Sequence, residues 1–123
     1  KRALIAKGAC ISCGQSPARP KRNMCQSCAT KKAKRAFSYY NRCRRLALQH
    51  YGGTCTCCGE QDEAFLVFDH MKGGGSAHRR RDRTAIQIGS WLIRNGFPCE
   101  FQILCHNCNF AKHTRGQCPH EEV

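Results

Sequence analysis

The chain has 123 residues, enough for one modest domain or two very small ones. Its 21 basic and 8 acidic side chains give a formal net charge of +13. No signal peptide and no apolar run of membrane-spanning length are recognisable, which argues against secreted and membrane proteins. We therefore expect a reducing, cytoplasmic setting and no membrane partner.

Cysteine is the most informative residue type, because twelve cysteines are unusual in a chain of this size. In a secreted protein they would indicate a disulfide framework. Most of them here lie in C-x2-C pairs, which suit a zinc knuckle, whereas disulfides at this spacing are usually redox-active. Because of this spacing we favour zinc over a disulfide framework as the staple that so short a chain, with little buried apolar surface, often needs.

Residues 1–29 resemble a zinc-ribbon-like module. Cys10 and Cys13 form one pair, Cys25 and Cys28 form the next, and eleven residues lie between the pairs. The segment has neither helical nor strand periodicity. We expect metal binding to determine its fold.

Residues 30–50 are predicted to form a basic helix or linker. Thr30 is a candidate N-cap, and Tyr51-Gly52-Gly53 would end the helix. A stripe of Phe37, Tyr40, Arg44 and Leu48 predicts that one face packs.

The first 50 residues contain 13 Lys or Arg and no Asp or Glu. Such a segment is typical of a nucleic-acid-binding surface, although a merely soluble basic protein or a solvated helix face would look similar. We expect the helix to contact the phosphate backbone of DNA through Lys31, Lys32, Lys34, Arg35, Arg42 and Arg45.

Residues 51–123 are predicted to form the third part of the chain. Its expected elements, in order, are a short buried strand over 65–68 that runs into Asp69 and His70, a Gly- and Arg-rich loop over 71–83, an amphipathic helix over 84–96, a strand over 101–104, a short helix with Asn109, Lys112 and His113, and a terminal loop over 116–123.

A second cysteine quartet brackets the two predicted strands. Cys55/Cys58 and Cys105/Cys108 are separated by 46 residues, so a zinc ion bound by both pairs would tie together segments that flank a working part. The first pair reads C-T-C-C, which makes Cys57 a competing ligand. The usual spacing of two intervening residues favours Cys55 and Cys58.

Asp69 and His70 carry the candidate chemistry. A neutral histidine can take a proton from water near neutral pH. A carboxylate can hold a hard divalent cation, and phosphodiester hydrolysis needs both an activated water and such a cation. A lone Asp-His pair is usually a surface turn. Its place between two knuckles, with Asn109 directly after the second, favours an active site.

These motifs together resemble a known family. The pattern Y-G-G-x-C-x-C-C-G, then F-D-H, a Gly-rich loop and L-C-x-N-C-N-x-x-K is similar to the HNH endonucleases, also called ββα-metal nucleases. It is most similar to the small HNH proteins common in bacteriophage genomes, which would place the chain in a bacterial or phage-infected cell. The resemblance covers residues 51–120 or so.

The resemblance implies a role for each matching position. Asp69 and Asn109 would bind a catalytic Mg²⁺ or Mn²⁺, His70 would be the general base, and Lys112 would contact a phosphate. The second cysteine quartet would hold a structural zinc ion. The implied fold is a small, zinc-stapled α+β protein with a ββα-metal core and an insertion over 71–100. The zinc-ribbon-like module and the basic helix precede this core in the sequence.

Two roles are possible for the histidine and for the arginines of the Gly- and Arg-rich loop. His78 is either a further group of the catalytic site or a plain loop histidine. Arg79 and Arg80, with Arg81 and Arg83, either hold the scissile strand or are solvated.

The sequence also departs from the family pattern. Glu100 stands where the family usually has its middle Asn, which puts the orientation of the base in question. Among the remaining cysteines, Cys118-Pro119-His120 is a candidate half of a third metal site, with free or buried thiols as the alternative.

We therefore predict a DNA endonuclease with two structural zinc ions and a catalytic Mg²⁺ or Mn²⁺. The alternative is a nucleic-acid-binding HNH and zinc-ribbon module of weak or no activity, within a larger nucleoprotein complex. A redox or metal-handling protein is disfavoured by the basic charge and the long cysteine bracket.

Overall fold

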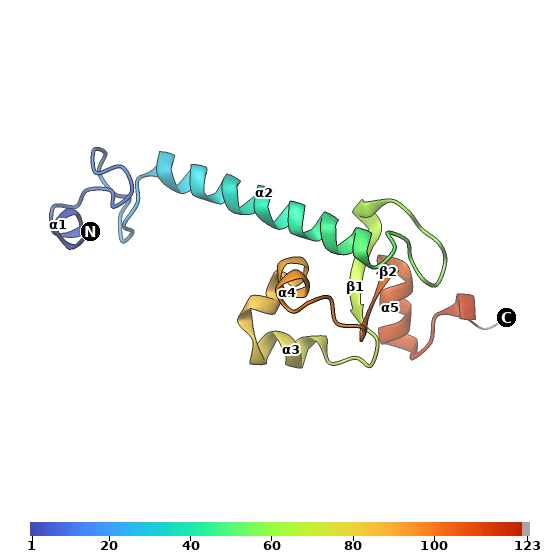
Figure 1. Cartoon of the computed structure of the whole chain (residues 1–123). Helices are drawn as coiled ribbons and strands as arrows, with labels where there is room; N and C mark the ends of the chain where they lie inside the picture. Colours follow the sequence, from blue (N-terminus) through green and yellow to red (C-terminus); the bar gives the residue numbers. More distant parts are fainter. Residues whose placement is uncertain (122–123) are drawn as a thin grey trace. The chain divides into compact units, whose positions relative to one another are not determined.

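The computed structural model describes residues 1–121, so Glu122 and Val123 of the predicted terminal loop lie outside the described residues. The chain divides into two compact units, Lys1–Tyr39 and Tyr40–Val123, and the boundary falls within helix α2 (Gln26–His50). Over these residues the structure is a small mixed α+β arrangement with one two-stranded sheet (Figure 1), which confirms the predicted α+β class. No helix within residues 1–121 has the length and apolar character needed to cross a membrane.

The first unit has more regular structure than the sequence predicted. A short helix, α1 (Arg2–Ala6), precedes the cysteine loops, and an isolated β-bridge joins Ala9 to Pro17. Helix α2 begins at Gln26, so the predicted start and the predicted Thr30 cap are wrong. Thr30 instead accepts a hydrogen bond inside the helix from the Gln26 side chain, at 3.1 Å.

Only the C-terminal part of α2 packs as predicted. Leu48 is buried together with Cys43 and Ala47, whereas Phe37 is 71% exposed and the prediction for it is wrong. The Arg44 guanidinium donates to the backbone carbonyls of Glu63 and Leu66 at 2.6 and 2.7 Å. These bonds fix α2 beside the start of the sheet.

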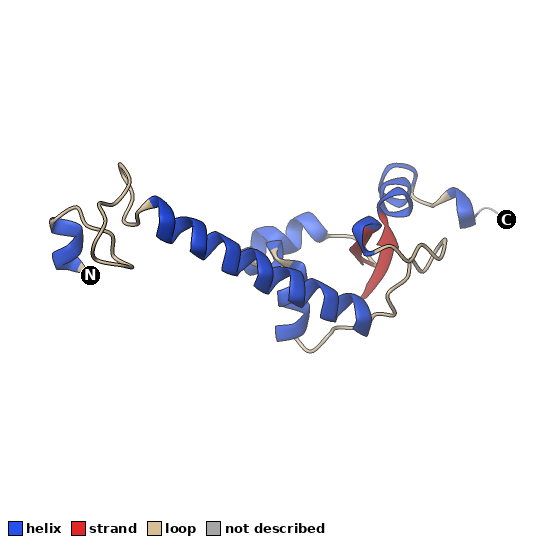
Figure 2. Cartoon of the chain, turned by 90° about the horizontal axis from the view of Figure 1, so that it is seen from above, coloured by secondary structure: helices blue, strands red, loops and turns tan. Residues whose placement is uncertain are grey.

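The sheet of the second unit consists of β1 (Leu66–His70) and β2 (Phe101–Cys105), which pair antiparallel. Both strands lie where the sequence predicts them, although Phe65 belongs to the preceding 3-10 turn η1 (Glu63–Phe65). Helix α5 (His106–Arg115) follows β2 directly, as expected, and lies beside the sheet (Figures 1 and 2). The terminal loop contains a 3-10 turn, η3 (Pro119–Glu121).

The segment between the strands differs from the prediction. The expected loop over 71–83 contains helix α3 (Gly75–Arg81), preceded by Gly74 in the left-handed conformation at φ 85°. The expected helix over 84–96 is divided into a 3-10 turn, η2 (Arg83–Ile86), and α4 (Ile88–Arg94). Asp82 explains the division, because its carboxylate accepts from the Thr84 backbone and from the Trp91 indole, at 3.0 and 2.9 Å.

The core of the second unit is small and rich in sulfur. One cluster contains Leu48, Leu66, Ile103 and Leu104 together with four buried cysteines, and another contains Ala47, Leu92 and Phe101. Helix α4 approaches α2 so closely that a Cβ on Gly89 would lie 2.8 Å from the Arg44 Cα. Because half of the first cluster is cysteine, the state of those thiols determines how well the sheet is held.

Candidate metal and active site

The structure gathers both predicted cysteine quartets. Within each quartet all four sulfur atoms lie within 4.8 Å of one another. All twelve cysteines fall within residues 1–121, and each has a free thiol. Both quartets geometrically suit zinc: Cys10, Cys13, Cys25 and Cys28 form one, and Cys55, Cys58, Cys105 and Cys108 form the other.

Backbone N–H groups point at the first sulfur of each pair. In Cys10, backbone hydrogen bonds from Cys13 and Cys25 lower the pKa of the thiol to about 6. In Cys55, burial raises the pKa, but backbone hydrogen bonds, first of all from Cys58, outweigh it and bring the pKa to about 6. Thiolates are the form that binds metal, so these backbone hydrogen bonds favour metal binding by Cys10 and Cys55. In the first quartet, by contrast, the hydrogen bond with the Cys25 thiol raises the pKa of Cys28 to about 11.

The second quartet has the spacing of a tetrahedral site. The Cys58 and Cys105 sulfurs are 3.6 Å apart, and a zinc ion with Zn–S bonds of about 2.3 Å would hold two sulfurs roughly 3.8 Å apart. Cys105 is also the N-cap of α5, where its sulfur accepts from the Cys108 backbone N–H. The quartet therefore fixes the start of α5 relative to the loop before β1.

Three of the four predicted catalytic residues, Asp69, His70 and Asn109, line one cavity of about 390 Å³. Asp69 and His70 come from the end of β1, and Asn109 comes from the first turns of α5. The cavity wall also includes Gly75 and Arg79 of α3. Residues separated by about 40 positions in the sequence thus meet at a single site.

Asp69 is held by two neighbours through one of its two carboxylate oxygens. It is 2% exposed, and its Oδ2 accepts from the Gln102 amide at 2.9 Å and from the Lys112 ammonium. Its Oδ1 and the Asn109 Oδ1 are both buried and have no hydrogen-bond partner among the described residues. Buried oxygens are normally satisfied, and a carboxylate with an amide carbonyl is a donor set that suits Mg²⁺ or Mn²⁺.

His78 lies beside His70. This position favours His78 as a further group of the candidate site over a plain loop histidine. The His70 Nε2 and His78 Nδ1 atoms are 2.9 Å apart, and His78 is 8% exposed. The Trp91 ring packs edge-on against His78, with centroids 4.3 Å apart. Burial, followed by the charges of His78 and Arg79, lowers the pKa of His70 below its usual value. The lowered pKa favours the neutral ring, which is the form that can accept a proton.

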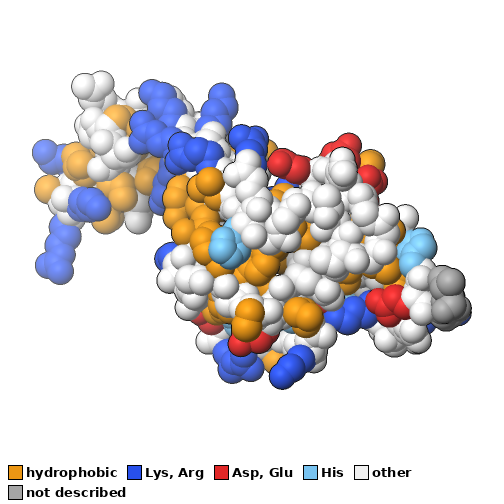
Figure 3. Space-filling model, turned by 45° about the vertical axis from the view of Figure 1, so that its right-hand side comes forward, with side chains coloured by type: hydrophobic (Ala, Val, Ile, Leu, Met, Phe, Trp, Pro, Cys, Tyr) orange, Lys and Arg blue, Asp and Glu red, His pale blue; other side chains and the backbone are white. Residues whose placement is uncertain are grey.

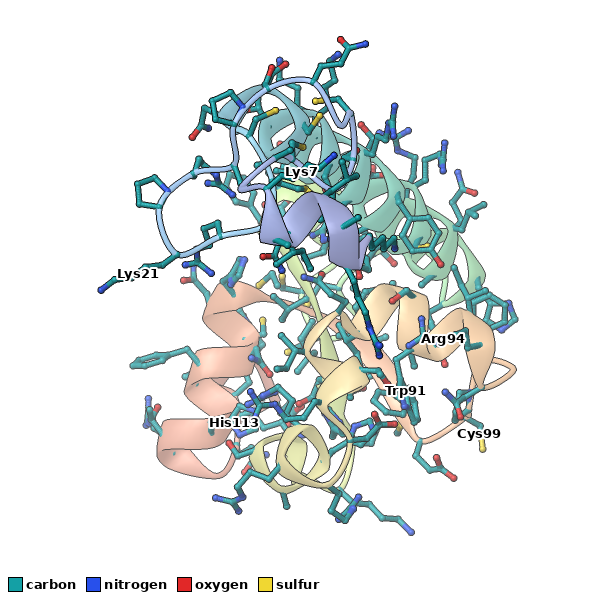
Figure 4. All side chains as sticks on the ribbon, turned by 90° about the vertical axis from the view of Figure 1, so that its left-hand side faces the viewer. Lys7, Lys21, Trp91, Arg94, Cys99 and His113 are labelled. Carbon is teal, nitrogen blue, oxygen red and sulfur yellow. The ribbon has the colours of Figure 1, made fainter. Side chains whose placement is uncertain are left out.

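Two residues at the site were not singled out from the sequence as site residues. His113 projects from α5 (Figure 4), and its Nε2 is 3.5 Å from the Asp69 Oδ1. Its spacing of four from Asn109 was the available signal, because residues i and i+4 share a helix face. Gln102 is the cross-strand partner of Asp69, which could be known only from the strand register.

The residues predicted to contact nucleic acid lie in several places. Lys112 is paired with Asp69 and also donates to the Met71 carbonyl at 3.0 Å. Arg45 is exposed and lies 3.8 Å from Glu63. Arg79 lines the cavity, and Arg80 is exposed on α3. The other predicted residues are exposed on α2, at Lys31, Lys32, Lys34, Arg35 and Arg42.

Basic side chains crowd the first unit and the adjoining turns of α2 (Figure 3), where the sequence supplies no acidic residue. Glu100 directly precedes β2, and its backbone carbonyl accepts from the Met71 N–H at 2.9 Å. This backbone contact closes the end of the sheet where β1 finishes and β2 begins.

Comparisons with protein-family models, with curated proteins and with solved structures found no match to this chain.

We predict that a strong zinc chelator lowers the melting temperature of the chain and that added Zn²⁺, but not Mg²⁺, restores it. Structural zinc binding contributes about 10–16 kcal/mol in zinc-finger peptides at neutral pH, and that free energy is coupled to folding. Thermal unfolding followed by circular dichroism measures the effect. Cys99→Ser is the control, because Cys99 is exposed at the edge of the molecule (Figure 4). Identical melting curves with and without chelator would show that zinc does not hold the fold.

Proposed function

We propose that this chain is a metal-dependent DNA endonuclease of the HNH type. The observation that carries the proposal is the cavity at the end of β1, where Asp69, His70 and Asn109 meet and two buried oxygens have no hydrogen-bond partner within residues 1–121. A carboxylate, an amide oxygen and a neutral imidazole in one cavity are the groups that metal-assisted phosphodiester hydrolysis requires.

Asp69 Oδ1 and Asn109 Oδ1 would hold the divalent cation, and Gln102 and Lys112 position the Asp69 carboxylate by holding its other oxygen. When bound, such a cation stabilises negative charge on the scissile phosphate and on the leaving oxygen. His113, 3.5 Å from the same carboxylate oxygen, is a candidate further ligand.

His70 would act as the general base. In the tautomer in which the His70 Nε2 donates to the His78 Nδ1, 2.9 Å away, the other ring nitrogen of His70, Nδ1, would be the proton acceptor. A Cβ on Gly75 would lie only 3.1 Å from that nitrogen, so Gly75 leaves open the side of the ring that faces the cavity. After His70 takes the proton from water, its Nε2–H still donates to His78, which keeps the ring oriented throughout the step.

Arg79 would bind the phosphate of the substrate. It lines the same cavity, and its guanidinium donates to Ser76 at 3.3 Å, which places the charge at the cavity wall. A guanidinium offers several donors that match the oxygens of a phosphate. Arg80 follows on α3 and is exposed, so it would extend the contact along the DNA strand.

A second candidate function rests on Lys112. Its ammonium already neutralises the buried Asp69 carboxylate, so the carboxylate is stable without a cation. That arrangement would also serve a nucleic-acid-binding module of weak or no activity within a larger assembly. The two functions differ in one outcome, namely cleavage of DNA in the presence of a divalent cation.

We predict that the zinc-loaded chain nicks supercoiled plasmid in Mg²⁺ or Mn²⁺ and that His70→Ala slows nicking about 10²- to 10⁴-fold, the usual contribution of a general base. His106→Ala is the matched control, since His106 is an exposed histidine of α5 outside the cavity. Equal nicking by His70→Ala and the wild type would overturn the assignment of the base. Absence of nicking by the wild type, with DNA binding retained, would favour the binding module.

We also predict that DNA binding depends steeply on salt through the basic part of α2. Replacing Lys31 and Arg35 with Gln should reduce the slope of log Kobs against log[salt] by about 1.8, since each lost phosphate contact removes roughly 0.9. Fluorescence anisotropy with a labelled duplex measures the slope, and Gln49→Ala, an exposed neutral position on α2, is the control. An unchanged slope would mean that Lys31 and Arg35 do not contact DNA phosphates.

A further inference from the structure

A third cluster of metal-ligating side chains lies next to the second quartet. The ligand atoms of Cys57, Cys108, Cys118 and His120 all lie within 4.8 Å of one another. The cluster joins three segments, namely the knuckle before β1, the first turn of α5 and the turn η3. It shares Cys108 with the quartet of Cys55, Cys58 and Cys105.

The distances in this cluster are those of a tetrahedral site. The His120 Nδ1 lies 3.2 Å from the Cys118 sulfur, 3.4 Å from the Cys108 sulfur and 3.8 Å from the Cys57 sulfur. With Zn–S bonds of about 2.3 Å and a Zn–N bond of roughly 2.0–2.1 Å, the tetrahedral angle separates nitrogen from sulfur by about 3.6 Å. Two of the three observed nitrogen–sulfur distances are slightly shorter than this value and one is slightly longer.

The chemistry of the ligands selects the metal. Three thiolates and one imidazole are soft or borderline donors, and a tetrahedral set of this kind is characteristic of zinc. Cys108 and Cys118 are 1% and 3% exposed, so two of the sulfurs are withdrawn from solvent. The arrangement also accounts for the C-T-C-C sequence, because Cys55 and Cys58 belong to one group while Cys57 belongs to the other.

We propose that the second unit holds two zinc ions joined by the Cys108 thiolate. Cys55, Cys58 and Cys105 complete one tetrahedron, and Cys57, Cys118 and His120 complete the other. Both groups contain the same Cys108 sulfur, and a thiolate has lone pairs enough to bridge two cations. The second ion adds two charges and takes two new thiolates, Cys57 and Cys118, so it leaves the net charge of the cluster unchanged.

The bridge has a structural consequence. It ties the C-terminal turn that carries His120 to the knuckle that begins the sheet and to the start of α5. Since Asn109 follows Cys108 directly, both zinc ions would fix the backbone next to a side chain that lines the cavity. The proposal concerns structural metal and is independent of catalytic activity.

The first test is the zinc content of the full chain by native mass spectrometry. The wild type should bind three zinc ions, one in the first unit and two in the bridged cluster. Cys118→Ser and His120→Ala should each bind two, and Cys99→Ser, at an exposed cysteine outside all three groups, should still bind three. Two zinc ions in the wild type would overturn the proposal.

The second test needs no variant and addresses the bridge itself. In the wild-type chain loaded with ¹¹³Cd, the spectrum should contain three resonances, and two of them should be split by coupling to each other through the shared Cys108 sulfur. Three unsplit resonances would mean that the third ion binds without a bridge, and two resonances would mean that it does not bind. Either of these results would overturn the proposal.

Discussion

Four thiols converge where the two strands of the sheet meet the start of α5, and the rest of the second unit is arranged around that convergence. In the described part of the chain the sheet has two strands and the apolar core is small, so burial alone gives limited stability. Cys55 and Cys58 precede β1, whereas Cys105 and Cys108 lie at the junction of β2 and α5. Holding these four sulfurs together sets the register of the strands and the direction of α5 at once.

The candidate active site follows from that scaffold. Once β1 and α5 are fixed, Asp69 and Asn109 face the same cavity, and neither needs a loop to place it. The segment between the strands adds the remaining groups, since α3 brings His78 to His70 and places Arg79 at the cavity wall. Asp82 and Trp91 support this segment through the hydrogen bond between them. The scaffold and the proposed chemistry thus use different donors, sulfur for the soft metal and oxygen for the hard one.

Short-range patterns in the sequence predicted the parts of the fold that depend on local order. Both strands, α5 and the two quartets follow from alternation, from periodicity and from C-x2-C spacing, and all are present. The start of α2 was missed because the cysteine turn around Cys25 begins the helix before Thr30 does. The predicted packing of Phe37 is wrong because a stripe of apolar residues does not show how far along the helix the surface that covers it extends.

The segment over 71–83 shows a different limit of sequence reasoning. Its glycines and arginines predict a loop, yet α3 forms there because His78 is buried against His70 and Trp91. That contact joins residues from three elements, so no local pattern contains it. The same is true of Gln102, whose role depends on the register that pairs it with Asp69. The proposed HNH chemistry rests on these tertiary contacts more than on any single motif.

We propose that a sulfur-bound scaffold presents Asp69 and Asn109 to a second, harder metal. Manganese binding to the zinc-loaded chain, measured by electron paramagnetic resonance, distinguishes this site from a purely structural one. The wild type should bind one Mn²⁺ at this site, and Asp69→Asn should lose that binding while its zinc content stays the same. If the zinc-loaded wild type binds no Mn²⁺, or if Asp69→Asn binds it equally well, the account of the site is contradicted.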